Sequence, residues 1–176
     1  MLTIPPAITL NTVREALHGL IYTALPVPPS PLLRLKLLDE VLADGPGVLG
    51  ADRGYALQRL LTAAVTQEWT RRCHCLGLTR PTPWETRAEA EVRLHQLAAH
   101  APKDTLCWAV VYYRYVKVDL NLSMADLARL LGVDRRSVQR YQNHAMQQLT
   151  YHLLEAEQAA RFHQSVSSLS GSAGSR

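Results

Sequence analysis

The stretch that decides the fold runs from residue 123 to residue 138 and reads SMADLARLLGVDRRSV. Ser123 and Asp126 have the spacing of a capping box, in which two side chains at the start of a helix satisfy each other's backbone N–H groups. Gly132 follows a leucine-rich run and can adopt the left-handed conformation that ends a helix. Asp134 can cap a second helix directly after it. The stretch therefore predicts two helices joined by a tight turn.

The spacing around Gly132 is typical of a helix-turn-helix. Ala128, four residues before the glycine, is small enough for two helices to cross closely there. Val138, six residues after the glycine, is a β-branched anchor in the second helix. Three further apolar side chains are expected in the core between the helices: Leu127, Leu131 and Val133.

The second helix leaves a polar face pointing outward. Arginine, glutamine and asparagine side chains are the types that pair with guanine, adenine and phosphate oxygens. The start of the first helix can also offer backbone N–H groups to a phosphate. We therefore interpret the segment as a binder of double-stranded DNA with these candidate contact residues: Ser123, Arg135, Arg136, Ser137, Gln139, Arg140 and Asn143.

Residues 104–150 resemble the C-terminal promoter-reading region of bacterial sigma factors (region 4), and they are similar to the DNA-binding domains of response regulators. The residues that carry the resemblance are Arg114-Tyr115, the run from Leu122 to Asp134, Ser137-Val138, and the run from His144 to Leu149. Two positions depart from the family pattern, because His144 replaces the usual arginine and Leu127 the usual isoleucine.

This resemblance implies that the second helix enters the major groove and that the protein regulates transcription. The positions that match the family's DNA contacts are Arg135, Arg136, Gln139, Arg140 and Asn143. No earlier segment matches the sigma region that binds the −10 promoter element and melts DNA. A complete sigma factor is therefore not expected.

Helical periodicity organises the rest of the chain, and no alternating run indicates a strand. The expected fold class is all-α, with an N-terminal helical bundle before the helix-turn-helix and a long terminal helix. The expected division is an extended leader at 1–10, a helical N-terminal region at 11–100, the helix-turn-helix at 104–162 and a flexible tail at 165–176.

Turn and cap residues place the helix ends in the N-terminal region. Asn11 is expected to cap the first helix, and Ser30-Pro31 to start a second one over 32–42. A third helix is expected from Asp52 to near Gly77. A fourth is expected to open at Thr82 or Pro83, with Glu85 in its first turn, and to close at Ala101-Pro102.

The recognition helix continues without a helix breaker. Its apolar period runs from Val138 to Ala160, which predicts one helix from Arg135 to about Phe162, roughly 40 Å long. Two accounts stay open for this helix. Its apolar stripe packs on the N-terminal helices, which we favour slightly, or it forms the arm of a homodimer that reads paired half-sites.

Composition limits the classes of protein to which the chain belongs. It has 176 residues, 47% of them hydrophobic, and a net charge of +4, which is compatible with a polyanionic partner without implying one. No apolar run reaches the roughly 18 residues that a membrane span needs, and the N-terminus lacks the pattern of a secretory signal. We expect a cytoplasmic protein with its three cysteines as thiols.

Other motifs have simpler structural interpretations. Cys73-His74-Cys75 lacks the second ligand pair that zinc needs, so we expect buried thiols and a surface histidine, with no metal or cofactor. Arg71-Arg72 is expected to complement the helix dipole. Trp108 and Tyr112 are expected in the core.

We expect no enzymatic activity, because no phosphate-binding loop and no catalytic motif is present. The acidic residues Glu85, Glu89 and Glu91 alternate with arginines and are interpreted as a solvated, ion-paired helix face. The alternative function is a helical adaptor that docks on RNA polymerase or another assembly without reading DNA.

Overall fold

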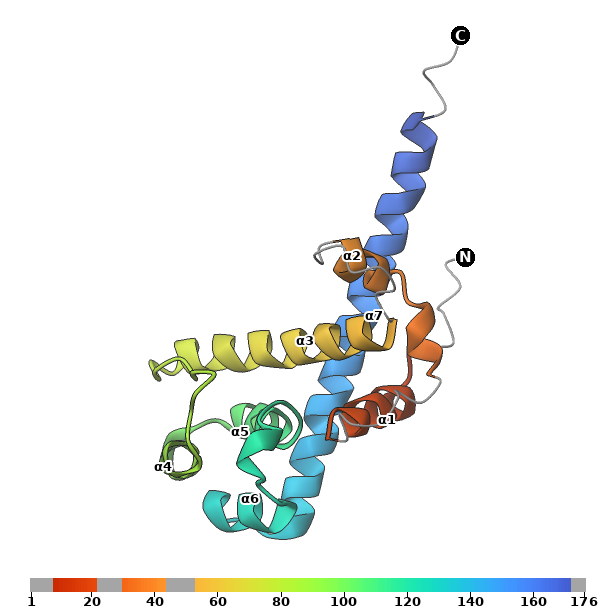
Figure 1. Ribbon diagram of the computed structural model, residues 1–176. Coiled ribbons are helices and arrows are strands. Elements are labelled where there is room, and N and C mark those ends of the chain that lie inside the picture. The colour runs from red at the N-terminus through yellow and green to blue at the C-terminus, as the bar shows by residue number, and fades with distance from the viewer. Residues whose placement is uncertain (1–7, 22–29, 44–52, 172–176) are drawn as a thin grey trace.

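The computed structural model describes residues 8–21, 30–43 and 53–171, which form helices and turns without a strand (Figure 1). This confirms the all-α fold class. The elements are α1 (Leu10–Ile21), the 3-10 turn η1 (Pro31–Arg34), α2 (Leu37–Ala43), α3 (Arg53–Cys75), α4 (Arg87–His100), α5 (Lys103–Val111), the π turn η2 (Tyr112–Val116), the 3-10 turn η3 (Val118–Leu120), α6 (Met124–Leu131) and α7 (Arg135–Gly171). Within the described ranges, no helix has both the length and the apolar character needed to cross a membrane.

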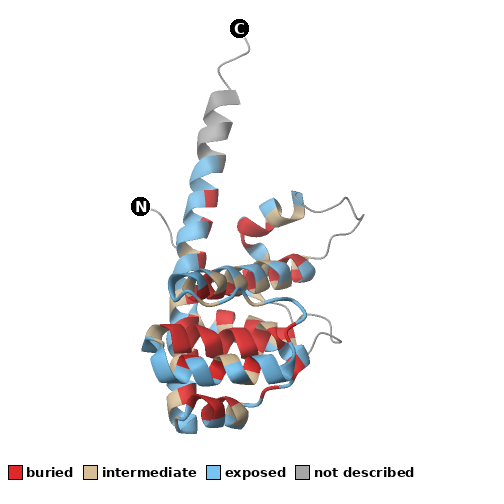
Figure 2. Cartoon of the chain, turned by 90° about the vertical axis from the view of Figure 1, so that its left-hand side faces the viewer, coloured by how far each residue is buried: buried red, intermediate tan, exposed pale blue. Residues whose placement is uncertain are grey.

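The core lies where α5 packs against α3 and α7 and η2 packs against α3. Figure 2 shows the buried residues gathered in the middle of the molecule. Trp69 of α3 stacks on Tyr112 with 5.6 Å between ring centres, and Trp108 is fully buried. Tyr112 is only 4% exposed. The expected core positions of Trp108 and Tyr112 are therefore confirmed.

The long helix α7 packs along one side of the molecule. Its buried residues face α1, α2, α5 and α6, which agrees with the packing account of its apolar stripe, and they include Val138, Ala145, Met146, Leu149, Leu153 and Ala160. The helix continues to Gly171 because no glycine or proline interrupts it earlier, so the predicted tail from Ser165 is wrong up to that residue. Figure 1 shows this last part extending beyond the other helices. Residues 172–176 lie outside the described part.

The first helix starts two residues earlier than predicted. Thr9 is its cap, since its Oγ1 accepts the backbone N–H of Thr12 at 3.2 Å. Asn11 therefore lies in the first turn of α1, where its Oδ1 accepts a hydrogen bond from Arg14. Of the predicted leader at 1–10, Leu10 is already helical and residues 1–7 lie outside the described part.

The predicted helix over 32–42 is two elements. Ser30 caps η1 as expected, with its Oγ accepting the Leu32 N–H, but α2 begins only at Leu37. The break is stabilised by tertiary contacts. The Glu157 carboxylate of α7 accepts the N–H groups of Lys36 and Leu37, both at 3.1 Å. Arg53 donates to the carbonyls that precede them, those of Leu33 and Leu35.

The helix predicted from Thr82 or Pro83 begins at Arg87 instead. Thr86 caps it in a capping box with Glu89, which supplies a better start than the residues before it. Glu85 thus precedes the helix and is buried, so its assignment to a solvated face is wrong. Its carboxylate accepts hydrogen bonds from Tyr113 Oη and from Arg93 Nε, the latter at 2.7 Å.

The end of α3 agrees in part with what the sequence predicts for residues 73–77. Gly77 follows the helix with φ +65°, and Cys73 is buried with a pKa raised by burial to about 11. His74 is exposed as expected, but Cys75 is exposed too, because it points away from the core at the last helical position. In the described part of the chain, no group of three or more histidine, cysteine or acidic residues could hold a metal ion.

Candidate nucleic-acid interface

The turn between α6 and α7 is built from local hydrogen bonds. Ser123 Oγ accepts the N–H of Asp126 at 3.1 Å, and the Asp126 carboxylate accepts the N–H of Ser123 at 2.9 Å. At the other end of α6, Gly132 has φ +63°, and the N–H of Val133 reaches back to the carbonyl of Ala128 at 3.0 Å. These contacts end the helix by the glycine-dependent C-cap that the sequence predicts.

The start of α7 is capped by Asp134. Its Oδ1 accepts the N–H of Ser137 at 2.7 Å, and its Oδ2 accepts the Ser137 hydroxyl. These bonds, the backbone one first, hold the pKa of Asp134 below its usual value, so the carboxylate is charged at neutral pH. A charged aspartate at a helix N-terminus also complements the helix dipole.

Apolar packing holds α6 against α7 and α4. Leu127 and Val138 are fully buried and Leu131 is 4% exposed, while Val133 is partly buried. Figure 1 shows α6 and α7 as two separate helices that meet at the lower end of the molecule. The outer face of the start of α7 is therefore not covered by α6.

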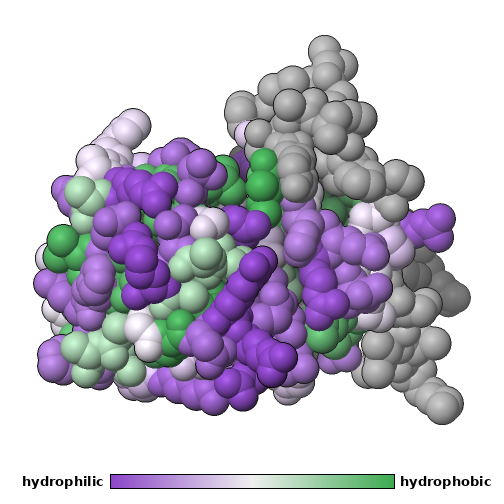
Figure 3. Space-filling view, turned by 90° about the horizontal axis from the view of Figure 1, so that it is seen from below, coloured by the Kyte–Doolittle hydropathy of each residue, from purple (hydrophilic) through white to green (hydrophobic). Residues whose placement is uncertain are grey.

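The exposed residues of this face are Arg135, Arg136, Gln139 and Arg140. None of the ion pairs among the described residues includes any of these three arginines. Seen from the end that carries α6, hydrophilic side chains cover much of the surface (Figure 3).

Five of the predicted contact residues already form hydrogen bonds within the protein, and for Gln139 and Arg140 these are bonds to other members of the set. The Ser137 hydroxyl bonds to Asp134 and accepts from Arg140 at 2.8 Å, and the Ser123 hydroxyl donates to Asp126 at 2.7 Å. Asn143 is half-buried, and its Oδ1 accepts long hydrogen bonds from Gln139 and from Arg14. The two serine hydroxyls thus take part in the capping contacts at the starts of α6 and α7.

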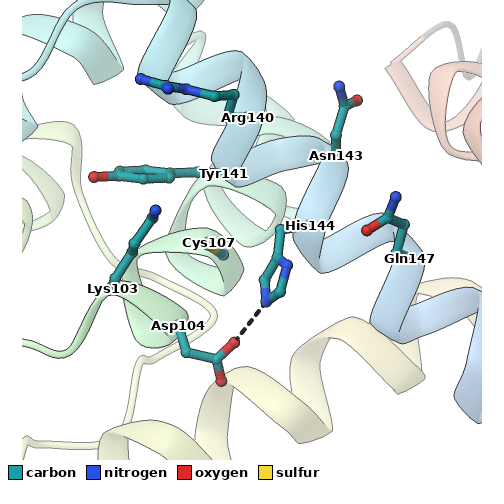
Figure 4. A pocket seen from close by; sticks show the side chains of 8 residues that line it. All are labelled: Lys103, Asp104, Cys107, Arg140, Tyr141, Asn143, His144 and Gln147. Carbon is teal, nitrogen blue, oxygen red and sulfur yellow. Dashed lines mark hydrogen bonds and ion pairs between the residues drawn. The ribbon is translucent and has the colours of Figure 1, made fainter.

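On one flank of α7 lies a groove of about 480 Å³ between α5 and α7 (Figure 4). Asp104 turns to one side of it, where it bonds to His144 and Gln148 and forms an ion pair with Arg72. Although burial opposes it, these bonds lower the pKa of Asp104. Lys103 instead lies 5.8 Å from the ring centre of Tyr141.

Arg71 and Arg72 form ion pairs in addition to the dipole interaction that the sequence predicts. Both guanidinium groups form ion pairs with Glu68, at 2.6 and 2.8 Å, and Arg72 is shared with Asp104. The side chain of Arg72 is 13% exposed. Its charge links α3 to the α5–α7 groove rather than only complementing the end of its own helix.

On the opposite flank, α1 brings residues that sequence reasoning missed. Arg14 Nη2 lies 3.4 Å from Asn143 Oδ1, and His18 Nε2 lies 3.1 Å from Tyr115 Oη. Arg114, in η2, donates to the Leu122 carbonyl just before α6. No sequence signal marks Arg14 as a neighbour of Asn143, since the two are 129 positions apart.

A scan against protein-family models, a search of curated proteins and a search of solved structures each find no match to this chain.

Proposed function

We propose that this protein binds double-stranded DNA in a sequence-specific manner through the first turns of α7 and thereby regulates transcription. The observation that carries the proposal is the exposed arginine-rich face at the start of α7. None of the ion pairs among the described residues includes its three arginines, although most other described arginines form one.

The side chains of this face have the chemistry of base and phosphate recognition. Arg136 and Arg140 can each donate two hydrogen bonds to guanine or to a phosphate, and Gln139 can bond to the N6 and N7 atoms of adenine. The major groove, about 12 Å wide, accepts an α-helix. In this proposal α6 crosses the DNA backbone, and the backbone N–H groups of its first turn face a phosphate.

The experiment is a selection of random duplexes by the purified protein at stated salt, followed by affinity measurements on the preferred site. Arg136→Ala and Gln139→Ala are each expected to cost about 1–3 kcal/mol of binding free energy at that site and less on an unrelated duplex. Matched controls are Arg80→Ala, in the exposed linker before α4, and Gln158→Ala, exposed on the distant part of α7. Both controls should bind as the wild-type chain does.

Two outcomes would contradict the proposal. An equal loss on every duplex would leave only a charge-driven, non-specific surface. No binding to any duplex at about 50 mM salt would remove DNA binding altogether.

A second candidate function is the adaptor that docks on RNA polymerase or another assembly. It is favoured by two large apolar side chains on the α4 side of the molecule, Trp84 at 86% and Val92 at 58% exposed. Exposed tryptophan is typical of protein-binding hot spots. If no duplex is bound, Trp84→Ala should abolish capture of a purified polymerase.

A further inference from the structure

Beside the recognition helix, α1 and η2 form a cluster of basic side chains, Arg14, His18 and Arg114, which we call the α1 basic cluster. Arg14 contacts Asn143 of α7 at 3.4 Å. His18 contacts Tyr115 through its Nε2, with 5.5 Å between the two ring centres. Arg114 contacts the Leu122 carbonyl at 3.4 Å. The cluster thus extends from the DNA-reading face of α7 to the residue before the Ser123 cap of α6.

The two arginines of this cluster have no ion-pair partner in the described part of the chain. None of the described ion pairs includes Arg14 or Arg114, and both residues are half-buried. Arg14 lies one helical turn before His18 on α1, and Arg114 is adjacent in sequence to Tyr115, which contacts His18. Partial burial, and then the charges of Arg114 and Arg14, lower the pKa of His18. Like charges held together without a counter-charge raise the energy of the free protein, and a bound anion relieves it.

The hydrogen bonds that the two arginines make are weak ones. Each is at least 3.4 Å long and goes to a neutral amide or carbonyl oxygen. A phosphate oxygen accepts shorter, charge-assisted bonds from a guanidinium, and it accepts two at once. Such a contact would also release Asn143 Oδ1, which needs to be free if the amide is to read adenine through both of its polar atoms.

We propose that the α1 basic cluster binds a backbone phosphate of the DNA, with Arg14 as the contact that α1 contributes. This inference rests on the proposed function and deepens it. It assigns a role to an N-terminal helix that lies outside the helix-turn-helix: α1 packs on α7 and adds a phosphate-binding side chain to the DNA-binding surface. Phosphate contacts position a protein on DNA and carry no sequence information of their own.

The test compares the wild-type chain with Arg14→Gln and Arg14→Lys, on the preferred duplex and on an unrelated one, over about 50 to 200 mM salt. Arg14→Gln should weaken binding about tenfold, by the same factor on both duplexes, because it removes a charge-assisted hydrogen bond. The slope of log affinity against log salt should become shallower by about 0.9, the value for one phosphate. Arg14→Lys keeps the charge and should retain most of the slope.

The matched control is Arg80→Gln, which removes the same charge from an exposed linker and should leave the slope unchanged. Circular dichroism and thermal unfolding check that each variant is folded. Ethylation of single DNA phosphates gives a readout on the wild-type chain that needs no variant. Binding should be lost when a phosphate other than those next to Arg136 and Arg140 is ethylated, at one position at least.

The outcomes separate this inference from the function on which it rests. If the wild-type chain selects a site and Arg14→Gln behaves as Arg80→Gln does, the phosphate contact is overturned and DNA binding stands. If Arg14→Gln changes which bases are selected at one position, Arg14 reads sequence and the phosphate assignment is wrong. If the wild-type chain binds no duplex at about 50 mM salt, the function itself fails and this inference fails with it.

Discussion

Two polar regions of this molecule differ in whether their charged side chains form ion pairs. Between α4 and η2, Glu85 is 4% exposed and accepts hydrogen bonds from Arg93 and Tyr113, so that each charged group has an opposite charge beside it. At the start of α7, Arg135 and Arg136 are exposed and take part in none of the described ion pairs. The first arrangement stabilises the fold. The second has no evident role in the fold, which makes it a candidate for contact with a partner.

The largest expected change in stability is in the buried region around Glu85. Glu85→Ala leaves the Arg93 guanidinium, 14% exposed, without its carboxylate and Tyr113 Oη without its acceptor. We expect a loss of about 3 kcal/mol in the free energy of unfolding, measured by urea denaturation. Glu15→Ala, at an exposed position of α1, is the control and should stay within about 0.5 kcal/mol of wild type. Similar losses for the two variants would show that Glu85 does not stabilise the fold.

A second prediction concerns the turn that leaves the arginine face exposed. Gly132 has φ +63° with open space where a Cβ would lie, so Gly132→Ala should cost about 1 kcal/mol from backbone conformation alone. Gly19 is the matched control, because it has equally open space but lies inside α1. Gly19→Ala should stabilise the protein by about 0.5–1 kcal/mol. The same sign of change at both glycines would contradict the role assigned to the turn.

A third prediction concerns pH. The side-chain hydrogen bond from Ser123, and then its backbone N–H, lower the pKa of Asp126 from its usual 3.8. The stabilisation from a lowered carboxyl pKa is present above the unfolded value and is lost as the pH falls through the folded value. Ser123→Ala should therefore cost about 1 kcal/mol at pH 7 and distinctly less when the pH is below the folded pKa. Urea denaturation at both pH values measures the difference. An equal loss of unfolding free energy at both pH values would show that the charged Asp126 carboxylate does not stabilise the start of α6.

The smallest expected change in stability is in the exposed region at the start of α7. Arg136→Gln removes a charge that no described carboxylate balances, so the free energy of unfolding should change by less than about 0.5 kcal/mol. Thermal unfolding measures it, and Arg93→Gln, at a buried ion pair, is the contrasting variant. A large loss of stability in Arg136→Gln would show that this arginine belongs to the fold rather than to a binding face.

Local patterns predicted much of the candidate site. The capping box of Ser123 and Asp126, the left-handed Gly132 and the Asp134 cap depend on side chains within a few residues of the backbone groups that they bind. One prediction failed because a distant group was involved. The helix expected over 32–42 is divided where Glu157, 120 and 121 residues away, binds its backbone N–H groups.

The amino-acid sequence by itself determined the all-helical fold class, the turn between α6 and α7, and the polar character of the first turns of α7, because periodicity and caps act over single helical turns. Only the tertiary structure decided which charges are balanced. It buried Glu85 against Tyr113, and it brought Arg14 of α1 to Asn143 of α7. Such pairings depend on how whole helices pack, and no local spacing in the sequence encodes them.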